Sequence, residues 1–192
     1  LRAAYPAVTL VVRHDGGSAS GVMQVAHTAA ELRVPAMISP DVSMTAALRF
    51  VLTRPANLGT DVTEWLERRG VRFVPQARHL VHKIIENSTG SRRVGTLLKE
   101  LPVTARTARF CLKNGDLPAP NRWLDLARGL NSALYIQRHH QRSLFSVALE
   151  LGYSDHSGLC KHMSRLFDER VGGIRETLGW AWLLERWLAK TV

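Results

Sequence analysis

The sequence contains few of the residues that mark disulfide-bonded, zinc-binding or membrane proteins. Its 192 residues include two cysteines, Cys111 and Cys160, which lie far apart and without CxxC spacing. This argues against a disulfide framework or a zinc ribbon and fits a reducing cytosol. No run approaches the roughly 20 uninterrupted apolar residues that span a bilayer. The opening "LRAAYPAVTLVV" reads as the approach to a buried strand rather than a secretory signal. We therefore expect a cytoplasmic protein without a membrane partner. Because the first residue is leucine, the question of whether an N-terminal segment is missing stays open.

Enzymatic motifs are also scarce, since no GxSxG, HExxH or P-loop pattern occurs. Among eight histidines, His79 and His82 stand three residues apart on one expected helix and His139 and His140 are neighbours. No third ligand has suitable spacing, so we expect no metal site, no cofactor and no enzyme. The glycine-rich "HDGGSASG" at residues 14–21 could cradle a phosphate, which leaves an α/β nucleotide-binding or enzymatic domain with accessory helices as an alternative.

Acidic residues are outnumbered, with 16 Asp and Glu against 26 Lys and Arg, for a formal net charge of +10. The excess is concentrated in the second half. Residues 89–192 contain 16 basic and 9 acidic residues, net +7, whereas residues 1–88 have net +3. A basic surface favours polyanionic partners, because Lys and Arg release condensed counterions when they meet phosphates.

Two regions differ in their periodicity. Up to residue 88, strand-length apolar runs (residues 7–12, 35–39 and, more weakly, 56–60) alternate with helical segments (22–33, 44–54, 61–70 and 76–87). This alternation predicts an α/β domain, a small open parallel sheet with helices on both faces. The polar stretch "NSTGSRR" at residues 87–93 is the expected linker. We therefore place one domain at residues 1–88 and a second, all-α domain at 89–192.

The second region repeats itself. "VGTLLKEL", a turn and "ARTARFCLKNG" form one helix-turn-helix pattern, and "SLFSVALEL", a glycine turn and "HSGLCKHMSRLF" form another. Equivalent positions are offset by 50 or 51 residues: Leu98, Pro102, Thr104, Ala108 and Leu112 correspond to Ala148, Gly152, Ser154, Leu159 and Met163. In the second pattern, Ser154 or Asp155 can cap the second helix. Between the patterns, a helix of about 20 residues, about 30 Å long, carries Trp123, Ala127, Leu130 and Leu134 on one face.

These residues resemble the C-terminal DNA-binding domain of the AraC/XylS family of transcription regulators, over residues 94–177. The family pattern Ala-x-x-x-Gly-aromatic-Ser-Asp appears as Ala148, Gly152, Tyr153, Ser154 and Asp155, and the family arginine as Arg175. The resemblance implies two helix-turn-helix units joined by one long helix. Several positions depart from the family pattern: Leu159, Met163, Asp168, Val171, Leu98 and Pro102 replace two phenylalanines, a glycine, a proline, a small residue and a glycine, respectively. In addition, Gly158 lies inside the expected second recognition helix.

The first region weakly resembles a degenerate receiver domain. Asp15 ends a strand where a receiver has its phosphoacceptor, but no acidic pair for Mg²⁺ is visible. Gly59 and Thr60 stand where a receiver has lysine and proline. We therefore expect dimerisation or sensing from residues 1–88, not phosphoryl signalling.

The side chains expected to contact DNA follow from the exposed faces of the two recognition helices and from their positions in the family motif. The resemblance implies that the base-reading residues are Arg106, Arg109, Phe110, His156, Ser157, Cys160 and Lys161. The expected phosphate contacts are Thr104, Lys113, Arg138, Arg142, Ser143, Ser164 and Arg165. Phe110 has a second interpretation as a core residue, and Arg175 is expected to be structural.

The sequence therefore predicts a transcription regulator that reads two adjacent major grooves of double-stranded DNA, with RNA polymerase and a second copy of the chain as further partners. A protein–protein adaptor that has lost DNA binding is the other alternative. The tail "GWAWLLERWLAKTV" either packs onto its own domain or forms a dimer helix.

Overall fold

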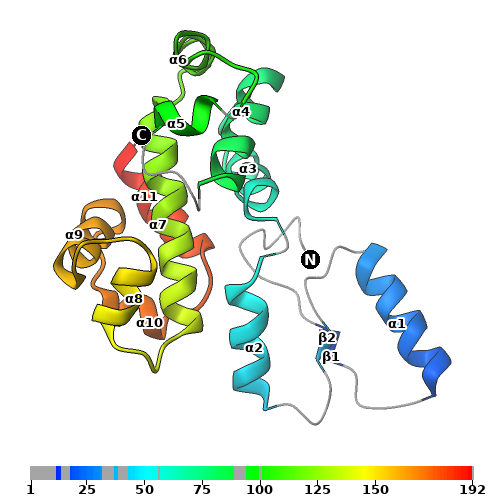
Figure 1. Cartoon of the computed structure of the whole chain (residues 1–192). Coiled ribbons are helices and arrows are strands. Elements are labelled where there is room, and N and C mark those ends of the chain that lie inside the picture. Colours follow the sequence, from blue (N-terminus) through cyan, green and yellow to red (C-terminus); the bar gives the residue numbers. More distant parts are fainter. Residues whose placement is uncertain are drawn as a thin grey trace. The chain divides into compact units, whose positions relative to one another are not determined.

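The computed structural model describes residues 12–13, 18–31, 37–38, 43–55, 57–88, 94–99 and 101–191. The chain divides into two compact units, residues 1–56 and 57–192 (Figure 1). In the first unit, strand β1 (Val12–Arg13) pairs in parallel with strand β2 (Met37–Ile38). Helix α1 (Ala19–Glu31) lies between them in sequence, and helix α2 (Met44–Thr53) follows.

The predicted α/β domain with an open parallel sheet is wrong. The described residues contain only two paired strands of two residues each, and nearly all the rest of their regular structure is helical. Within the expected third strand at residues 56–60, residues 58–60 instead begin helix α3 (Leu58–Arg68). The side chain of Asn57 accepts a hydrogen bond of 2.8 Å from the Thr60 N–H and so caps this helix. A short apolar run does not by itself distinguish a strand from a buried helix, which explains the error.

The boundary between the units also differs from the predicted one at residue 88. Helix α3 and helix α4 (Pro75–Glu86) belong to the second unit, and α4 packs against helices on the far side of the expected linker. Val81, Ile84 and Ile85 of α4 are fully or almost fully buried in the same hydrophobic core as Leu112 and Trp123. Tertiary packing therefore joins two helices that the linker composition had separated.

The second unit contains the two expected helix-turn-helix patterns. The first consists of helices α5 (Val94–Lys99) and α6 (Ala105–Asn114), and the second of α8 (Leu144–Glu150) and α9 (His156–Phe167). The long helix α7 (Pro120–Arg138) runs between them, followed after α9 by α10 (Val171–Glu176) and α11 (Ala181–Thr191). Figure 1 shows α6 near one end of α7 and α8, α9 and α10 beside its other half.

Local interactions explain why the two patterns fold alike. The Thr104 hydroxyl accepts a hydrogen bond from the Thr107 N–H at 3.1 Å, and the Asp155 carboxylate accepts one from the Gly158 N–H at 2.7 Å. These two N-caps are 51 residues apart, so Asp155 rather than Ser154 is the equivalent of Thr104. The expected buried equivalents, Ala108 with Leu159 and Leu112 with Met163, are all fully buried.

Two left-handed residues end the helices of the second pattern. Gly152 has a φ of 77°, as predicted for a glycine that ends α8. Asp168 closes α9 with a φ of 53°, at the position where the family pattern has glycine. Aspartate is one of the few residues that visits this region at a modest cost, so the replacement preserves the turn.

Helix α7 approaches α9 closely at Gly129. A β-carbon on Gly129 would lie 2.4 Å from Leu166 Cδ1 and 3.0 Å from Phe167 Cζ, both in buried side chains. The C-terminal tail packs on the same unit: Leu183, Leu184 and Trp187 of α11 are buried in its core. Of the two predicted roles for the tail, packing onto its own domain or forming a dimer helix, the structure therefore shows the first.

We expect the same substitution to have opposite effects at two helical glycines. Gly129→Ala should lower the free energy of unfolding by about 1–3 kcal/mol, because the added methyl group overpacks the contact with α9. Gly158→Ala should raise it by up to about 1 kcal/mol, since its β-carbon would meet nothing closer than 3.7 Å. Urea unfolding followed by tryptophan fluorescence reports on the second unit alone, because all five tryptophans lie within residues 57–192. Equal stabilisation by both changes would contradict the close approach.

Candidate nucleic-acid interface

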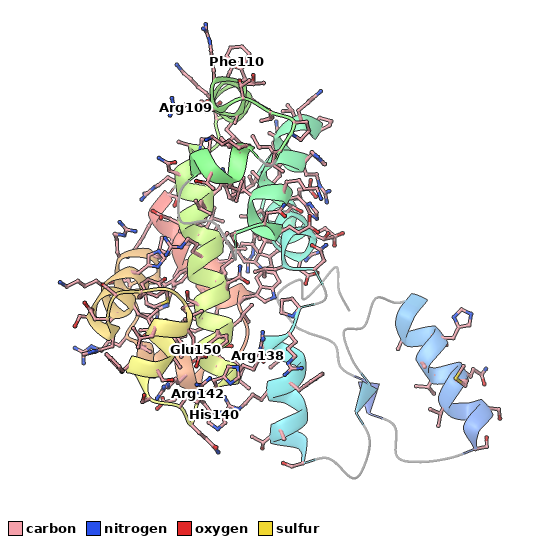
Figure 2. All side chains as sticks on the ribbon, viewed as in Figure 1. Arg109, Phe110, Arg138, His140, Arg142 and Glu150 are labelled. Carbon is pink, nitrogen blue, oxygen red and sulfur yellow. The ribbon has the colours of Figure 1, made fainter. Side chains whose placement is uncertain are left out.

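Helix α6, the expected first recognition helix, exposes a basic face. It buries Ala108 and Leu112 and leaves Arg106, Arg109, Phe110 and Lys113 exposed. Phe110 is 65% exposed, which excludes its interpretation as a core residue. Figure 2 shows Arg109 and Phe110 on the outer side of α6. All four side chains are free to meet a ligand, as the periodicity predicted.

Helix α9, the expected second recognition helix, exposes a polar face with two cations. The exposed residues of this face are His156, Ser157, Lys161, Ser164 and Arg165. Cys160 is different, because its side chain is only partly exposed and packs against the hydrophobic core. The side chain of Cys160, which was predicted to read bases, is thus less accessible than those of the other predicted base-reading residues of α9.

A polar pair joins the half-buried Tyr153 to the buried His162 of α9. The Tyr153 hydroxyl and His162 Nδ1 are 2.5 Å apart, and the same hydroxyl is 3.2 Å from the Ser132 hydroxyl of α7. The guanidinium of Arg128 lies 5.6 Å from the centre of the Tyr153 ring. These contacts tie the motif tyrosine to both α7 and α9. The sequence analysis missed His162, which lies between the exposed Lys161 and the buried Met163.

Burial lowers the pKa of His162 to about 4, although the Asp125 carboxylate raises it in part. The imidazole is therefore neutral at pH 7. His162 Nε2 is buried and has no hydrogen-bond partner among the described residues. Protonation at this position would place a charge where desolvation disfavours it, so the pair is stable only while His162 is neutral.

Two predicted phosphate contacts serve as helix caps. Thr104 caps α6, and the Ser143 hydroxyl accepts a hydrogen bond from the Ser146 N–H at 3.2 Å, which caps α8. Both residues are exposed. Their hydroxyls stabilise the first turns of α6 and α8 directly, whether or not a phosphate binds beside them.

Arg142 is held by acidic and hydroxyl groups of its own unit. Its guanidinium forms two hydrogen bonds with the Glu150 carboxylate, one of them at 2.8 Å, and another with Ser146 at 3.1 Å. The Tyr135 hydroxyl also donates to Glu150, and hydrogen bonds from Tyr135 and Arg142 lower the pKa of that carboxyl. Figure 2 shows Arg142 and Glu150 near each other at the α8 end of the unit, with Arg138 and His140 in the same region.

A phosphate at Arg142 would therefore compete with Glu150, a residue that the sequence analysis did not identify. The two residues are eight positions apart across a turn, a spacing that is not a helical pair. Arg138, the other predicted contact in this region, is only partly exposed.

Two further arginines also have partners. Arg165 is 3.3 Å from the Asp125 carboxylate, but its side chain stays 63% exposed. Arg175 donates a hydrogen bond to the backbone carbonyl of Arg142, which joins α10 to the turn before α8. This contact agrees with the structural role predicted for Arg175.

Other predicted features lie elsewhere. Asp15 and residues 14–17 of the glycine-rich segment are outside the described residues, and Gly59 lies in α3. Within the described part of the chain, no group of three His, Cys, Asp or Glu residues is arranged to hold a metal ion. Among the helices described, none has both the length and the apolar character needed to cross a membrane.

Comparison of the chain with known protein families, curated proteins and solved structures finds no significant match.

The buried histidine should make the unit sensitive to acid. The folded-state pKa of about 4 lies below the unfolded value of about 6.5, so the unfolded state binds more protons between these values. The contribution of His162 to the free energy of unfolding is fully present above about pH 6.5 and is lost as the pH falls toward 4. At pH 5 the loss from this group is about 2 kcal/mol.

His162→Gln should remove this part of the pH dependence, measured by urea unfolding at pH 7 and pH 5, whereas His156→Gln on the exposed face should leave it unchanged. An unaltered pH dependence in His162→Gln would show that other groups cause it.

Proposed function

We propose that this chain is a cytoplasmic, sequence-specific DNA-binding protein that regulates transcription, and that α6 and α9 enter two adjacent major grooves. The observation that carries the proposal is the equivalence of these helices. Each follows a tight turn, begins at a side-chain cap, buries an apolar stripe and exposes a polar face with at least two cations. One capped helix with such a face is commonplace, but two in equivalent places suit a duplex with a regular groove repeat.

The dimensions of the long helix support this arrangement. Helix α7 has 19 residues and is therefore about 28 Å long. Major grooves on one face of B-DNA recur about every 34 Å. Helix α6 lies near one end of α7 and α9 lies beside its other half, an arrangement that suits two grooves on one face of a duplex (Figure 1).

The side chains divide into two groups by what they can reach. Arginine can bond the O6 and N7 of guanine together, so Arg106 and Arg109 suit base reading in the first groove. His156, Ser157 and Lys161 occupy the corresponding first turns of α9. Lys113, Ser164 and Arg165 lie further along the two helices and suit the phosphates. Residues 57–192 have 21 Lys and Arg against 13 Asp and Glu, which favours the approach of DNA.

An adaptor that binds protein instead of DNA is the second candidate. It is favoured by Phe145 and Leu149, which stand one turn apart on α8 and are 57% and 48% exposed. Gly158, the glycine inside the expected second recognition helix, does not interrupt α9, which runs unbroken over His156–Phe167 with the Gly158 N–H bonded to the Asp155 cap. The two candidates differ in one simple respect, since an adaptor would not retain duplex DNA.

We expect the full chain to bind duplex DNA, with log affinity falling linearly as log salt rises. The probe would be a site selected from a random duplex library, and the measurement fluorescence anisotropy from about 50 to 200 mM salt, where phosphate contacts weaken strongly. Arg109→Ala should weaken binding by about 1–3 kcal/mol and relax base preference in one half of the site. Arg68→Ala is the matched control, because it removes one exposed arginine of α3 outside both recognition helices. Undetectable binding at about 50 mM salt, or equal losses in the two variants, would refute the proposal.

The selected site should contain two short boxes read by one protomer. Insertion of about 5 base pairs between them turns one box to the opposite face of the duplex, and a single protomer then cannot contact both. After this insertion of about 5 base pairs, affinity should fall toward that of a site with one box. Insertion of about 10 base pairs returns both boxes to one face of the duplex but places them further apart than α7 can span. Unchanged affinity after the shorter insertion would show that only one recognition helix reads DNA.

A further inference from the structure

Helix α6 has an apolar side chain at the centre of its exposed face. The helix buries Ala108 and Leu112. Successive residues of an α-helix are turned by about 100°, so Phe110 lies about 160° around the axis from each of these two buried residues. It is therefore opposite the stripe that packs on the core, and its side chain is 65% exposed. Figure 2 shows Phe110 on the outer side of α6.

The surroundings of Phe110 are basic. Arg106 stands one turn before it and Lys113 one turn after it, at the spacings of four and three residues that bring side chains together on one helix face. Arg109 is adjacent in sequence, and α6 contains no acidic residue. Single apolar side chains on a protein surface are ordinary. What distinguishes Phe110 is its position among three exposed cations, in the middle of the face that would enter a major groove.

The ring of Phe110 is not engaged within the protein. Among the residues that the structure describes, none forms a ring contact or a cation–π contact with Phe110. Other arginines of the second unit do lie over aromatic rings, as Arg69 does over Trp65. The face of the Phe110 ring is therefore available to an apolar group of a ligand.

The equivalent position of α9 carries a different chemical group. The caps Thr104 and Asp155 define an offset of 51 residues between the two helices. The same offset pairs Phe110 with Lys161, which is also exposed. The two helices therefore present a benzene ring and an ammonium group at the same place on their outer faces. This difference predicts that the two boxes differ in the base that meets this position.

Thymine is the base whose major-groove edge suits an apolar side chain. Its C5 methyl group projects into the groove, and phenylalanine is among the side chains that contact it. The other groups that specify the bases there are hydrogen-bond donors and acceptors, which a benzene ring does not satisfy. Arg106 and Phe110 are four residues apart, about 6 Å along the helix axis, which corresponds to about two base steps. A guanine bonded by Arg106 would thus lie about two base pairs from such a thymine.

We propose that Phe110 selects thymine in the box that α6 reads, by packing its ring against the C5 methyl group. This inference rests on the proposed function, because it requires α6 in a major groove. It adds to that function a specific base and a specific chemical group on it. The second box, where Lys161 takes the equivalent place, does not depend on a methyl group at this position.

The test replaces thymine by uracil, which removes the C5 methyl group and leaves base pairing unchanged. Duplexes of the selected site would carry uracil at single thymines, and the first box is the one in which Arg109→Ala relaxes base preference. At one thymine of that box, uracil should weaken binding of the unaltered chain about fourfold, the value expected for one buried methyl group. Phe110→Ala should bind the thymine and uracil duplexes equally.

The matched control is Phe145→Ala, which also removes an exposed phenylalanine but lies on α8, outside both recognition helices. This variant should retain the difference of about fourfold between thymine and uracil. Urea unfolding should show unchanged stability for both variants, because both side chains are more than half exposed.

The outcomes separate this inference from the function on which it rests. Absence of duplex binding would overturn both. Duplex binding would leave the function standing, but three results would then overturn the role of Phe110. These are a first box without thymine, no effect of uracil at any thymine of the first box, and an equal effect of uracil in Phe110→Ala and the unaltered chain. The second of these results, with full duplex affinity in Phe110→Ala, would favour a protein partner for the ring instead.

Discussion

The contact between α7 and the helices around it is the constraint on which the second unit depends. Trp123, Ala127 and Leu130 are at most 1% exposed, and α4, α9 and α10 all pack on the same helix. Gly129 sets the distance to α9, because any side chain there would enter the space of Leu166 and Phe167. Since both helix-turn-helix patterns rest on α7, their mutual spacing is a property of one rigid element rather than of a flexible connection.

This dependence separates the residues that stabilise the unit from those available for binding. Apolar side chains on the inner faces of α6 and α9 are fully buried, whereas the basic residues on the outer faces contribute little to stability. Substitutions such as Arg109→Ala therefore report on binding with little effect on folding. Substitutions of the caps Thr104 and Asp155 would instead affect folding, because these side chains stabilise the first turns of the helices that carry the exposed residues.

Intramolecular partners restrict several polar side chains that the sequence alone would leave free. Glu150 and Tyr135 hold Arg142, and Tyr153 and Ser132 hold the region around His162. Each network links residues from two helices, so it also fixes the helices relative to each other. For Arg142, a phosphate must compete with a carboxylate, and the net gain from that contact is smaller than for an exposed arginine such as Arg109, which has no ion pair among the described residues.

Short-range patterns in the sequence determined much of the second unit. The positions of α6, α7 and α9, the left-handed Gly152 and the buried residues Leu159 and Met163 follow from helical periodicity and cap chemistry, which act over a few residues. Only tertiary structure decided that residues 58–60 begin a helix, that α4 joins the second unit and that Phe110 is exposed while His162 is buried. It also created the Arg142–Glu150 pair and the close approach of α7 to α9 at Gly129. Such features depend on which faces of distant helices meet, and that choice is set by the packing of the whole core rather than by any local pattern.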